Sequence, residues 1–381
     1  MRRYKTYING EWFEGASGIV LRSVDPSNNK ELGEIVQNSK EDVEYAIESA
    51  SRSFYKTREW RDLDVQQRSD KLLKIADMIE SEIDEIAKTE SMDNGKPLRE
   101  AQADVDDAVH CFRYYAGLIR TPSGQTYNVN SNFGNMHSYT VKEPVGVCAL
   151  ITPWNFPFLM SVWKIAPALA AGNSIIFKPS SETVLSALKL FEILDKCDLP
   201  KGTANLVIGS GSTVGNLLAE SKKVDMITFT GSTSVGQGIM RAAAGNVKKI
   251  GLELGGKSPN IVFADTDIDK TVECVMMGIF LNQGEVCCAG SRLIIEKSIK
   301  DKFLKKLVER TDKLTLGAPL DNPDMGPLIS KKHMQDVLGY IEKGKAEGAK
   351  LLCGGYKCTD DDLVNGNFIK PAIFDDCTPD M

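Results

Sequence analysis

Five short apolar segments, separated by stretches with helical spacing, constrain the fold more than any other feature of this sequence. The segments are rich in β-branched residues and too short to be helices, which is typical of strands. Strands that alternate with helices predict a parallel sheet with crossover helices, so the expected fold class is α/β. The segments are VGVCALI (145–151), NSIIFK (173–178), ANLVIG (204–209), VDMITFTG (224–231) and KIGLELGG (249–256).

A second alternation follows and indicates a second α/β unit. It consists of NIVFA (260–264), a helix to about residue 282, RLIIE (292–296), helices near 300–312 and 331–347, and AKLLCGG (349–355). At the other end of the chain, residues 4–36 favour strands and turns. There Asn9-Gly10 predicts a tight type I′ hairpin.

Three helical regions lie between that hairpin and the first alternation. Ser39, with Asp42 three residues on, is close to a capping box and predicts a helix start. Amphipathic regions at 64–88 and 96–118 favour two further helices that cover a core. Residues 121–141 are polar with alternating apolar positions, which predicts either a solvated hairpin or an arm that pairs with another subunit.

Composition excludes several classes of function. A length of 381 residues predicts two or three domains. The net charge of −6 disfavours nucleic acid and anionic membranes as partners. Nine cysteines without a CxxC, and no apolar leader, indicate a cytosolic protein with reduced thiols. Only three histidines disfavour a histidine-built metal site, so no metal is expected.

Glycines and hydroxyls collect where the five predicted strands end. Ligands of open α/β sheets bind beyond the carboxyl ends of the strands. Gly231-Ser232-Thr233 could present backbone N–H groups to a phosphate at a helix start. Together these segments predict a nucleotide cofactor, although GSGSTVG lacks the spacing of the usual dinucleotide fingerprint. The segments are TPWNFP (152–157), KPSSET (178–183), GSGSTVG (209–215), TGSTSVG (230–236) and ELGGKSPN (253–260).

Two adjacent cysteines, Cys287 and Cys288, raise the question of a nucleophile. Free cysteine most often packs as a small hydrophobe. The local residues alone leave both readings open.

Longer motifs resolve the question by resemblance. PWNFP, KPSS, FTGSTSVG, LELGGKSPN and GEVCCAGSR occur in the order and spacing of the NAD(P)-dependent aldehyde dehydrogenase superfamily. INGEW, DNGKP, EPVGV, APALAAGN and MGPLIS match as well, so the chain resembles that family over nearly its whole length. The resemblance is to the non-acylating branch, of the betaine aldehyde dehydrogenase kind. It implies a Rossmann-like cofactor domain (1–120 and 142–254), an oligomerisation arm (121–141) and a second α/β catalytic domain (255–381).

The resemblance also implies roles for individual residues. Cys287 matches the nucleophile, Glu253 the general base and Asn155 the oxyanion-stabilising amide, while Lys164 would help to relay protons. The implied reaction oxidises an aldehyde to the acid with NAD or NADP through a thiohemiacetal and a thioester. The implied cofactor contacts are Thr152, Trp154, Lys178, Ser181, Gly211, Gly215, Gly231, Ser232 and Gly236, and the implied substrate contacts are Phe156, Met160 and Trp163.

Plainer readings exist for several of these residues. Lys164 is most simply a solvated helix residue, and Phe156 and Trp163 are more often core than substrate contacts. Asn155 could merely hold a turn. Glu253 could be a solvated carboxylate, but its place between two leucines before Gly-Gly is not typical of the surface.

Three departures from the family pattern change what is expected. Glu285 replaces the usual Gln beside the nucleophile; it would raise the pKa of the thiol by like-charge repulsion, or point away. Ser181 stands where many NAD-preferring members have Glu, so NADP should be tolerated, with Lys178 meeting its phosphate; a preference for NADP stays open, because Glu182 next to it could substitute by a one-residue shift. The sequence ends before the family's E-x-F-G-P motif, so the catalytic domain is expected to be incomplete, and if this is the whole polypeptide its dehydrogenase activity is expected to be weak or absent.

Two alternatives to the enzyme remain. One is a catalytically impaired fragment that keeps only the fold and the cofactor-binding surface; the other is a cofactor-independent thiol esterase. A papain-like enzyme is disfavoured because its cysteine motif is missing. The expected partners are a small-molecule aldehyde and further copies of the chain, as a dimer or tetramer, in the cytoplasm.

Overall fold

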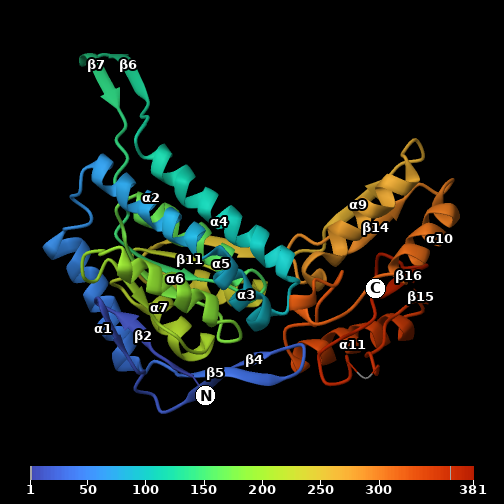
Figure 1. The fold of residues 1–381 in the computed structure, drawn as a ribbon. Coiled ribbons are helices and arrows are strands. Elements are labelled where there is room, and N and C mark those ends of the chain that lie inside the picture. The colour runs from blue at the N-terminus through green and yellow to red at the C-terminus, as the bar shows by residue number, and fades with distance from the viewer. Residues whose placement is uncertain (1, 361) are drawn as a thin grey trace.

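The computed structural model describes residues 2–360 and 362–381. Figure 1 shows a large α/β part (blue to yellow), a protruding hairpin, and a smaller α/β part (orange to red) that contains the C-terminal end. The predicted first domain begins at Met1, which lies outside the described residues. The α/β class expected from the sequence is confirmed.

The large part is built on a seven-stranded sheet with the order β12-β11-β8-β9-β10-β2-β3. The five strands predicted from the first alternation are all present, and neighbours among them pair in parallel. Their carboxyl ends therefore meet at one edge of the sheet. The strands are β8 (Val147–Ile151), β9 (Ser174–Lys178), β10 (Ala204–Leu206), β11 (Met226–Gly231) and β12 (Lys249–Leu254).

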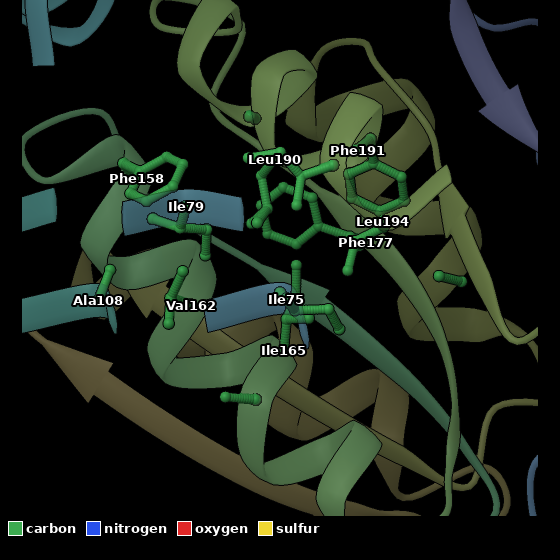
Figure 2. Close-up of a cluster of buried hydrophobic side chains, with 14 of the residues drawn as sticks. Ile75, Ile79, Ala108, Phe158, Val162, Ile165, Phe177, Leu190, Phe191 and Leu194 are labelled. Carbon is green, nitrogen blue, oxygen red and sulfur yellow. The ribbon is translucent and has the colours of Figure 1, made fainter. Parts of the chain in front are cut away.

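Two hydrophobic clusters pack on opposite faces of this sheet because strand side chains alternate. Cys148 and Leu150 of β8 belong to one cluster, whereas Val147, Ala149 and Ile151 belong to the other. Figure 2 shows part of the first cluster, where Phe177 of β9 lies among side chains of the covering helices. The helices of that face include α2 (Val65–Ser81), α4 (Leu98–Leu118), α5 (Pro157–Ala170) and α6 (Leu185–Lys196); the other face is covered by α1 (Lys40–Arg52), α7 (Asn216–Glu220) and α8 (Thr233–Ala243).

The N-terminal predictions hold with one exception. Asn9 and Gly10 have positive φ angles of 56° and 80° and join β2 (Thr6–Ile8) to β3 (Glu11–Phe13). Ser39 and Asp42 form a complete capping box on α1. The predicted single helix at 64–88 is wrong, because α2 ends at Ser81 and α3 (Ile83–Asn94) begins after Glu82. A three-stranded sheet of β1 (Arg3–Tyr4), β5 (Lys30–Val36) and β4 (Val20–Asp25) completes this region.

The smaller part follows the second alternation. Its parallel pair β13–β14 packs with α9 and α10 around Val262, Val272 and Phe303. Helix α11 and the antiparallel pair β15–β16 lie beside it. The elements are β13 (Pro259–Val262), α9 (Ile268–Phe280), β14 (Arg292–Ile295), α10 (Lys300–Thr311), α11 (Lys331–Ala346), β15 (Lys350–Cys353) and β16 (Ile373–Asp375).

Residues 121–141 form a hairpin that projects from the large part (Figure 1). Its strands β6 (Thr126–Ser131) and β7 (Gly134–Tyr139) pair only with each other and are exposed nearly throughout. Phe133 at the tip is 96% exposed. None of the described helices combines the length and apolarity needed to cross a bilayer.

Candidate active site

Residues 281–288, called the nucleophile loop below because they carry the predicted nucleophile Cys287, have an unusual backbone. Asn282, Gln283 and Gly284 follow one another in the left-handed region, with φ angles of 47°, 57° and 80°. Side chains other than glycine rarely adopt this conformation, and its cost is met by contacts around it. The amide of Asn282 donates to Glu100 Oε2 at 2.9 Å, and the amide of Glu285 closes the turn on the Asn282 carbonyl at 2.8 Å.

One side of the nucleophile loop is bound to the turn that follows β8. Asn155 Nδ2 donates to the Glu285 carbonyl at 2.7 Å, and Asn282 Nδ2 donates to the Asn155 carbonyl at 2.8 Å. Asn94, at the end of α3, donates to the Trp154 carbonyl at 2.9 Å. The side-chain amide of Asn155 therefore has a fixed position two residues from Cys287.

The other side of the loop is bound to residues 326–329. The amide of Gly326 donates to Gln283 Oε1 at 3.3 Å, and the amide of Ile329 donates to Glu285 Oε1 at 3.0 Å. Of the two orientations expected for Glu285, the structure thus turns its carboxyl toward Ile329, where the side chain is only 2% exposed. Burial raises the pKa of Glu285 to about 8.

Cys287 lies at the open end of this loop and is exposed, as is Cys288. Partial burial raises the pKa of the Cys287 thiol above its ordinary value, and the neighbouring Cys288 adds to the rise, whereas the backbone N–H groups of both residues favour the thiolate. A Cβ added to Gly256, just after β12, would come 3.2 Å from the Cys287 carbonyl. The loop therefore touches the end of β12.

Glu253 and Lys164 approach this edge from β12 and α5. Glu253 is exposed, so the expectation that its place between leucines would bury it is wrong. Lys164 is only 9% exposed, so the reading as a solvated helix residue is also wrong. Its Nζ donates to Thr228 Oγ1 at 2.8 Å. Burial lowers the pKa of Lys164 to about 8, and the opposing influence is the charge of Glu253.

A buried ionic cluster supports the turn after β8 from below. Lys96 is fully buried, its Nζ bonds to Asp104 and lies 3.7 Å from Glu90, and it sits 4.1 Å above the centre of the Phe156 ring. Glu90 in turn accepts the amide of Phe158 at the start of α5. Phe156 therefore packs on this cluster, while Met160 is half-buried and Trp163 is 53% exposed on α5.

The residues expected to hold a nucleotide line the carboxyl edge of the sheet. Thr152 directly follows β8, and Thr230 is the second-last residue of β11. Each has a buried hydroxyl without a hydrogen-bond partner among the described residues. Lys178 ends β9 with a buried amine that meets the Pro179 carbonyl at 2.9 Å, and burial lowers its pKa to about 8. Such orphaned and desolvated polar groups fit a polar ligand at this edge.

The glycines at this edge fall into two groups: two have open space beside the backbone, and two are closely packed. No atom would touch a Cβ at Gly211, and one at Gly215 would meet only Lys178. At Gly231 a Cβ would collide with the Phe229 ring, and Gly236 packs against Leu254. Ser232 caps α8 by accepting the Val235 amide, and Ser181 is half-exposed. Trp154 packs on His333 with ring centroids 5.1 Å apart.

Several residues that build the site carry no role in the sequence analysis. Asn94, Glu100, Asn282, Gln283 and His333 all hold the two turns. Asn94 lies in the DNGKP motif and Gln283 directly precedes GEVC. The motifs therefore marked Asn94 and Gln283 as positions of interest, but they gave no indication of which residues these two would contact.

Comparison with known proteins places this geometry in context. A family model described as "Aldehyde dehydrogenase family" matches residues 12–381. A curated betaine aldehyde dehydrogenase of Bacillus subtilis (strain 168) is 46% identical over 98% of this chain and 76% of its own length. Human mitochondrial aldehyde dehydrogenase is 40% identical over 98% of the chain and 72% of its own length. A crystal structure of Staphylococcus aureus betaine aldehyde dehydrogenase with NAD+ superposes with a TM-score of 0.96 at 41% identity, covering 99% of this chain and 74% of that one.

Proposed function

Because the chain belongs to the aldehyde dehydrogenase family, we propose that it oxidises an aldehyde and water to the carboxylic acid with NAD+ or NADP+ at the edge where its parallel strands end. The observation that carries this proposal is the double attachment of the nucleophile loop. It brings Asn155 to the residues next to Cys287 and leaves the thiol exposed.

Cys287 acts as the nucleophile in this proposal. An aldehyde carbon has no leaving group except hydride, which departs only from an electron-rich tetrahedral centre. The Cys287 thiolate creates that centre by attacking the carbonyl carbon and forming a thiohemiacetal. Since the pKa of this thiol is raised, a base must take its proton near neutral pH.

Asn155 stabilises the oxyanion that forms in this attack. Its side-chain nitrogen carries two hydrogens, and one of them bonds to the Glu285 carbonyl. The second has no partner among the described residues and is free to donate to the substrate oxygen. The donor is held by the loop before the substrate arrives, so it needs no reorganisation during the reaction.

Glu253 acts as the general base. Its carboxylate takes the proton of Cys287 through water and later activates the water that hydrolyses the thioester. Lys164, whose pKa is influenced by the charge of Glu253, is the partner for moving protons at this edge.

The residues at the strand ends fit a nicotinamide dinucleotide. Lys178, the hydroxyls of Thr152 and Ser181, and the start of α8 at Ser232 would hold its polar groups, and the flat face of Trp154 would contact it. When bound, NAD(P)+ supplies the acceptor for the hydride. Because Ser181 carries no charge that would repel a 2′-phosphate, we propose that NADP+ is accepted as well as NAD+.

The substrate class is a small aldehyde that reaches Cys287 past Phe156, Met160 and Trp163. Two named relatives are betaine aldehyde dehydrogenases, so betaine aldehyde is one candidate beside aliphatic and aromatic aldehydes. We further propose a homo-oligomer that uses the β6–β7 hairpin. Nine free cysteines fit a reducing location such as the cytoplasm.

The test is absorbance at 340 nm for a panel of aldehydes, including betaine aldehyde, with NAD+ and NADP+ in parallel. We expect turnover with at least one aldehyde, and its loss in Cys287→Ala but not in Cys274→Ala, which removes another exposed thiol. Turnover that persists without Cys287 would refute the assignment, and hydrolysis of esters without cofactor as the only activity would favour the esterase. A rate with NADP+ that is negligible beside NAD+ would overturn the role given to Ser181.

A further inference from the structure

The side chain of Glu285 is the feature of the site that the reaction above does not use. Its carboxyl is buried between the nucleophile loop and residues 326–329, both of which belong to the smaller α/β part. Oε1 accepts the Ile329 amide at 3.0 Å and lies 3.5 Å from His333 Nε2. Oε2 is buried and has no hydrogen-bond partner among the described residues.

The main chain of the same residue orients a proposed catalytic group. The Glu285 carbonyl accepts Asn155 Nδ2 at 2.7 Å, so the residue has one attachment on each side of the loop. If the side-chain attachment to Ile329 loosens, the carbonyl that fixes Asn155 moves with it. Displacements of about 1 Å are enough to change a rate by up to about a hundredfold.

His333 makes the second contact of the buried carboxyl. It lies in the first turn of α11, and its ring packs on Trp154 with centroids 5.1 Å apart. Burial lowers the pKa of His333, which favours a neutral ring with one nitrogen able to accept a proton. His333 Nε2 therefore lies beside the buried carboxyl at 3.5 Å, as a neutral polar neighbour that supplies no charge to balance an ionised Glu285.

The charged groups near Glu285 and His333 are already paired, so they would not neutralise an ionised Glu285. Lys96 acts on Glu285 from the segment between α3 and α4, but its amine is already engaged by Asp104 and Glu90. Gln283, on the loop itself, acts on Glu285 as a side-chain hydrogen-bond donor and opposes the rise of its pKa, although its Nε2 also donates to Asn282 Oδ1 at 3.4 Å. On α11, Asp336 raises and Lys332 lowers the pKa of His333, and these two residues pair with each other.

We propose that Glu285 is a positioning residue for the reaction at Cys287, and that the proton on its buried carboxyl keeps this side chain docked on Ile329 and so keeps Asn155 oriented. Loss of the proton leaves a buried carboxylate with one N–H donor and one unpartnered oxygen. Such a group draws in water, and the nucleophile loop separates from residues 326–329. Docking of the loop is thus tied to pH through a group that never touches the substrate.

The test compares Glu285→Gln with the unaltered chain at matched pH. Glutamine keeps an oxygen for the Ile329 amide but cannot release a proton. Hydrogen–deuterium exchange of the peptide covering 281–290 is the readout, because it needs neither aldehyde nor cofactor. At pH 6 we expect residues 281–290 to exchange at nearly the same rate in the unaltered chain and in Glu285→Gln. By pH 9 the unaltered chain should exchange at least fivefold faster than the variant.

Two further variants sharpen this test. Glu285→Ala removes the docking group and should raise exchange of 281–290 at every pH, whereas Glu342→Gln, an exposed carboxylate on α11, should match the unaltered chain throughout. Equal pH dependence in Glu285→Gln and the unaltered chain would overturn the role given to the Glu285 proton. An unchanged loop in Glu285→Ala would overturn the docking role.

Kinetics provide an independent readout that rests on the proposed function. If the chain oxidises aldehydes, kcat should fall at alkaline pH in the unaltered chain and less in Glu285→Gln, with KM little changed. Glu285→Ala should lose up to about a hundredfold in kcat at every pH. Absence of aldehyde turnover would refute the proposed function, while the exchange experiment would still decide the role of Glu285.

Discussion

Asn155 shows how the site depends on a single side chain whose orientation other residues impose. One of its side-chain N–H groups donates to the Glu285 carbonyl, so the direction of the other N–H group is fixed. Asn155→Ala removes a preorganised donor, and we expect kcat to fall about 100- to 1,000-fold, with a small effect on KM. Asn246→Ala, a surface amide that contacts the Lys222 carbonyl, serves as the control in the same assay. Equal losses in both variants would contradict the oxyanion role.

Glu285 also predicts how stability depends on pH. Its pKa is raised by burial to about 8 from an ordinary value near 4.5, so between these values the folded chain keeps a proton that the unfolded chain has released. The free energy of unfolding therefore falls as pH rises through this window, by up to about 1.4 kcal/mol per pH unit.

Glu285→Gln removes that slope. We expect the stability of the variant relative to the unaltered chain to increase from pH 5 to pH 8, measured by urea denaturation at each pH. The exposed Glu342→Gln is the control and should show no such trend. A constant difference between Glu285→Gln and the unaltered chain across the window would show that Glu285 is not held as a neutral acid.

The sequence predicts which residues carry the chemistry, but it does not predict the residues that hold them in place. Cys287, Asn155 and Glu253 stand out because each lies in a motif that names its position. Asn94, Asn282 and His333 are ordinary polar residues, distant in sequence from the groups that they contact. Only the fold brings them together, so no local pattern could predict their contacts.

At the scale of elements, local chemistry predicted well where a turn or cap dictates the backbone. Asn9-Gly10 and the Ser39 capping box are such cases, and both are confirmed. The break between α2 and α3 is not of this kind. Apolar residues continue at helical spacing across Glu82, and no glycine or proline marks the interruption. Tertiary packing decides it, so the sequence predicted one helix.

Gly95 and Gly326 approach each other closely where the two α/β parts meet. A Cβ at Gly326 would collide with the Gly95 carbonyl, while Gly95 itself has a φ of 100°. Gly326→Ala should therefore push residues 326–329 away from the nucleophile loop, lowering stability by about 1–3 kcal/mol and activity with it. Thermal unfolding and turnover check both effects.

Gly339→Ala is the matched control for that substitution. Gly339 lies on the exposed side of α11, and a Cβ there would meet no atom within 4 Å. Alanine in a helix interior should raise stability by about 0.5–1 kcal/mol and leave turnover unchanged. A gain of stability at both positions would show that the close approach at Gly326 is not a constraint.

For the whole molecule, the projecting hairpin is the part whose role a single chain cannot explain. Its exposed apolar side chains include Phe133, Tyr139 and Val141, at 96%, 67% and 70% exposure. We expect replacement of residues 124–140 by a short glycine linker to lower the molar mass measured by light scattering. Tyr340→Ser, which removes another exposed ring, should leave the molar mass unchanged. A monomeric unaltered chain would contradict the proposed arm.

The close backbone contact of Gly95 with Gly326 also limits how this chain can be recombined with its relatives. A chimera with a crossover anywhere between these two positions takes one half of the contact from each parent. Such a chimera keeps the close contact only if the parent that supplies residue 95 has glycine at position 95 and the parent that supplies residue 326 has glycine at position 326. Parents for such shuffling are best chosen by the residues at these two positions, before overall similarity is considered.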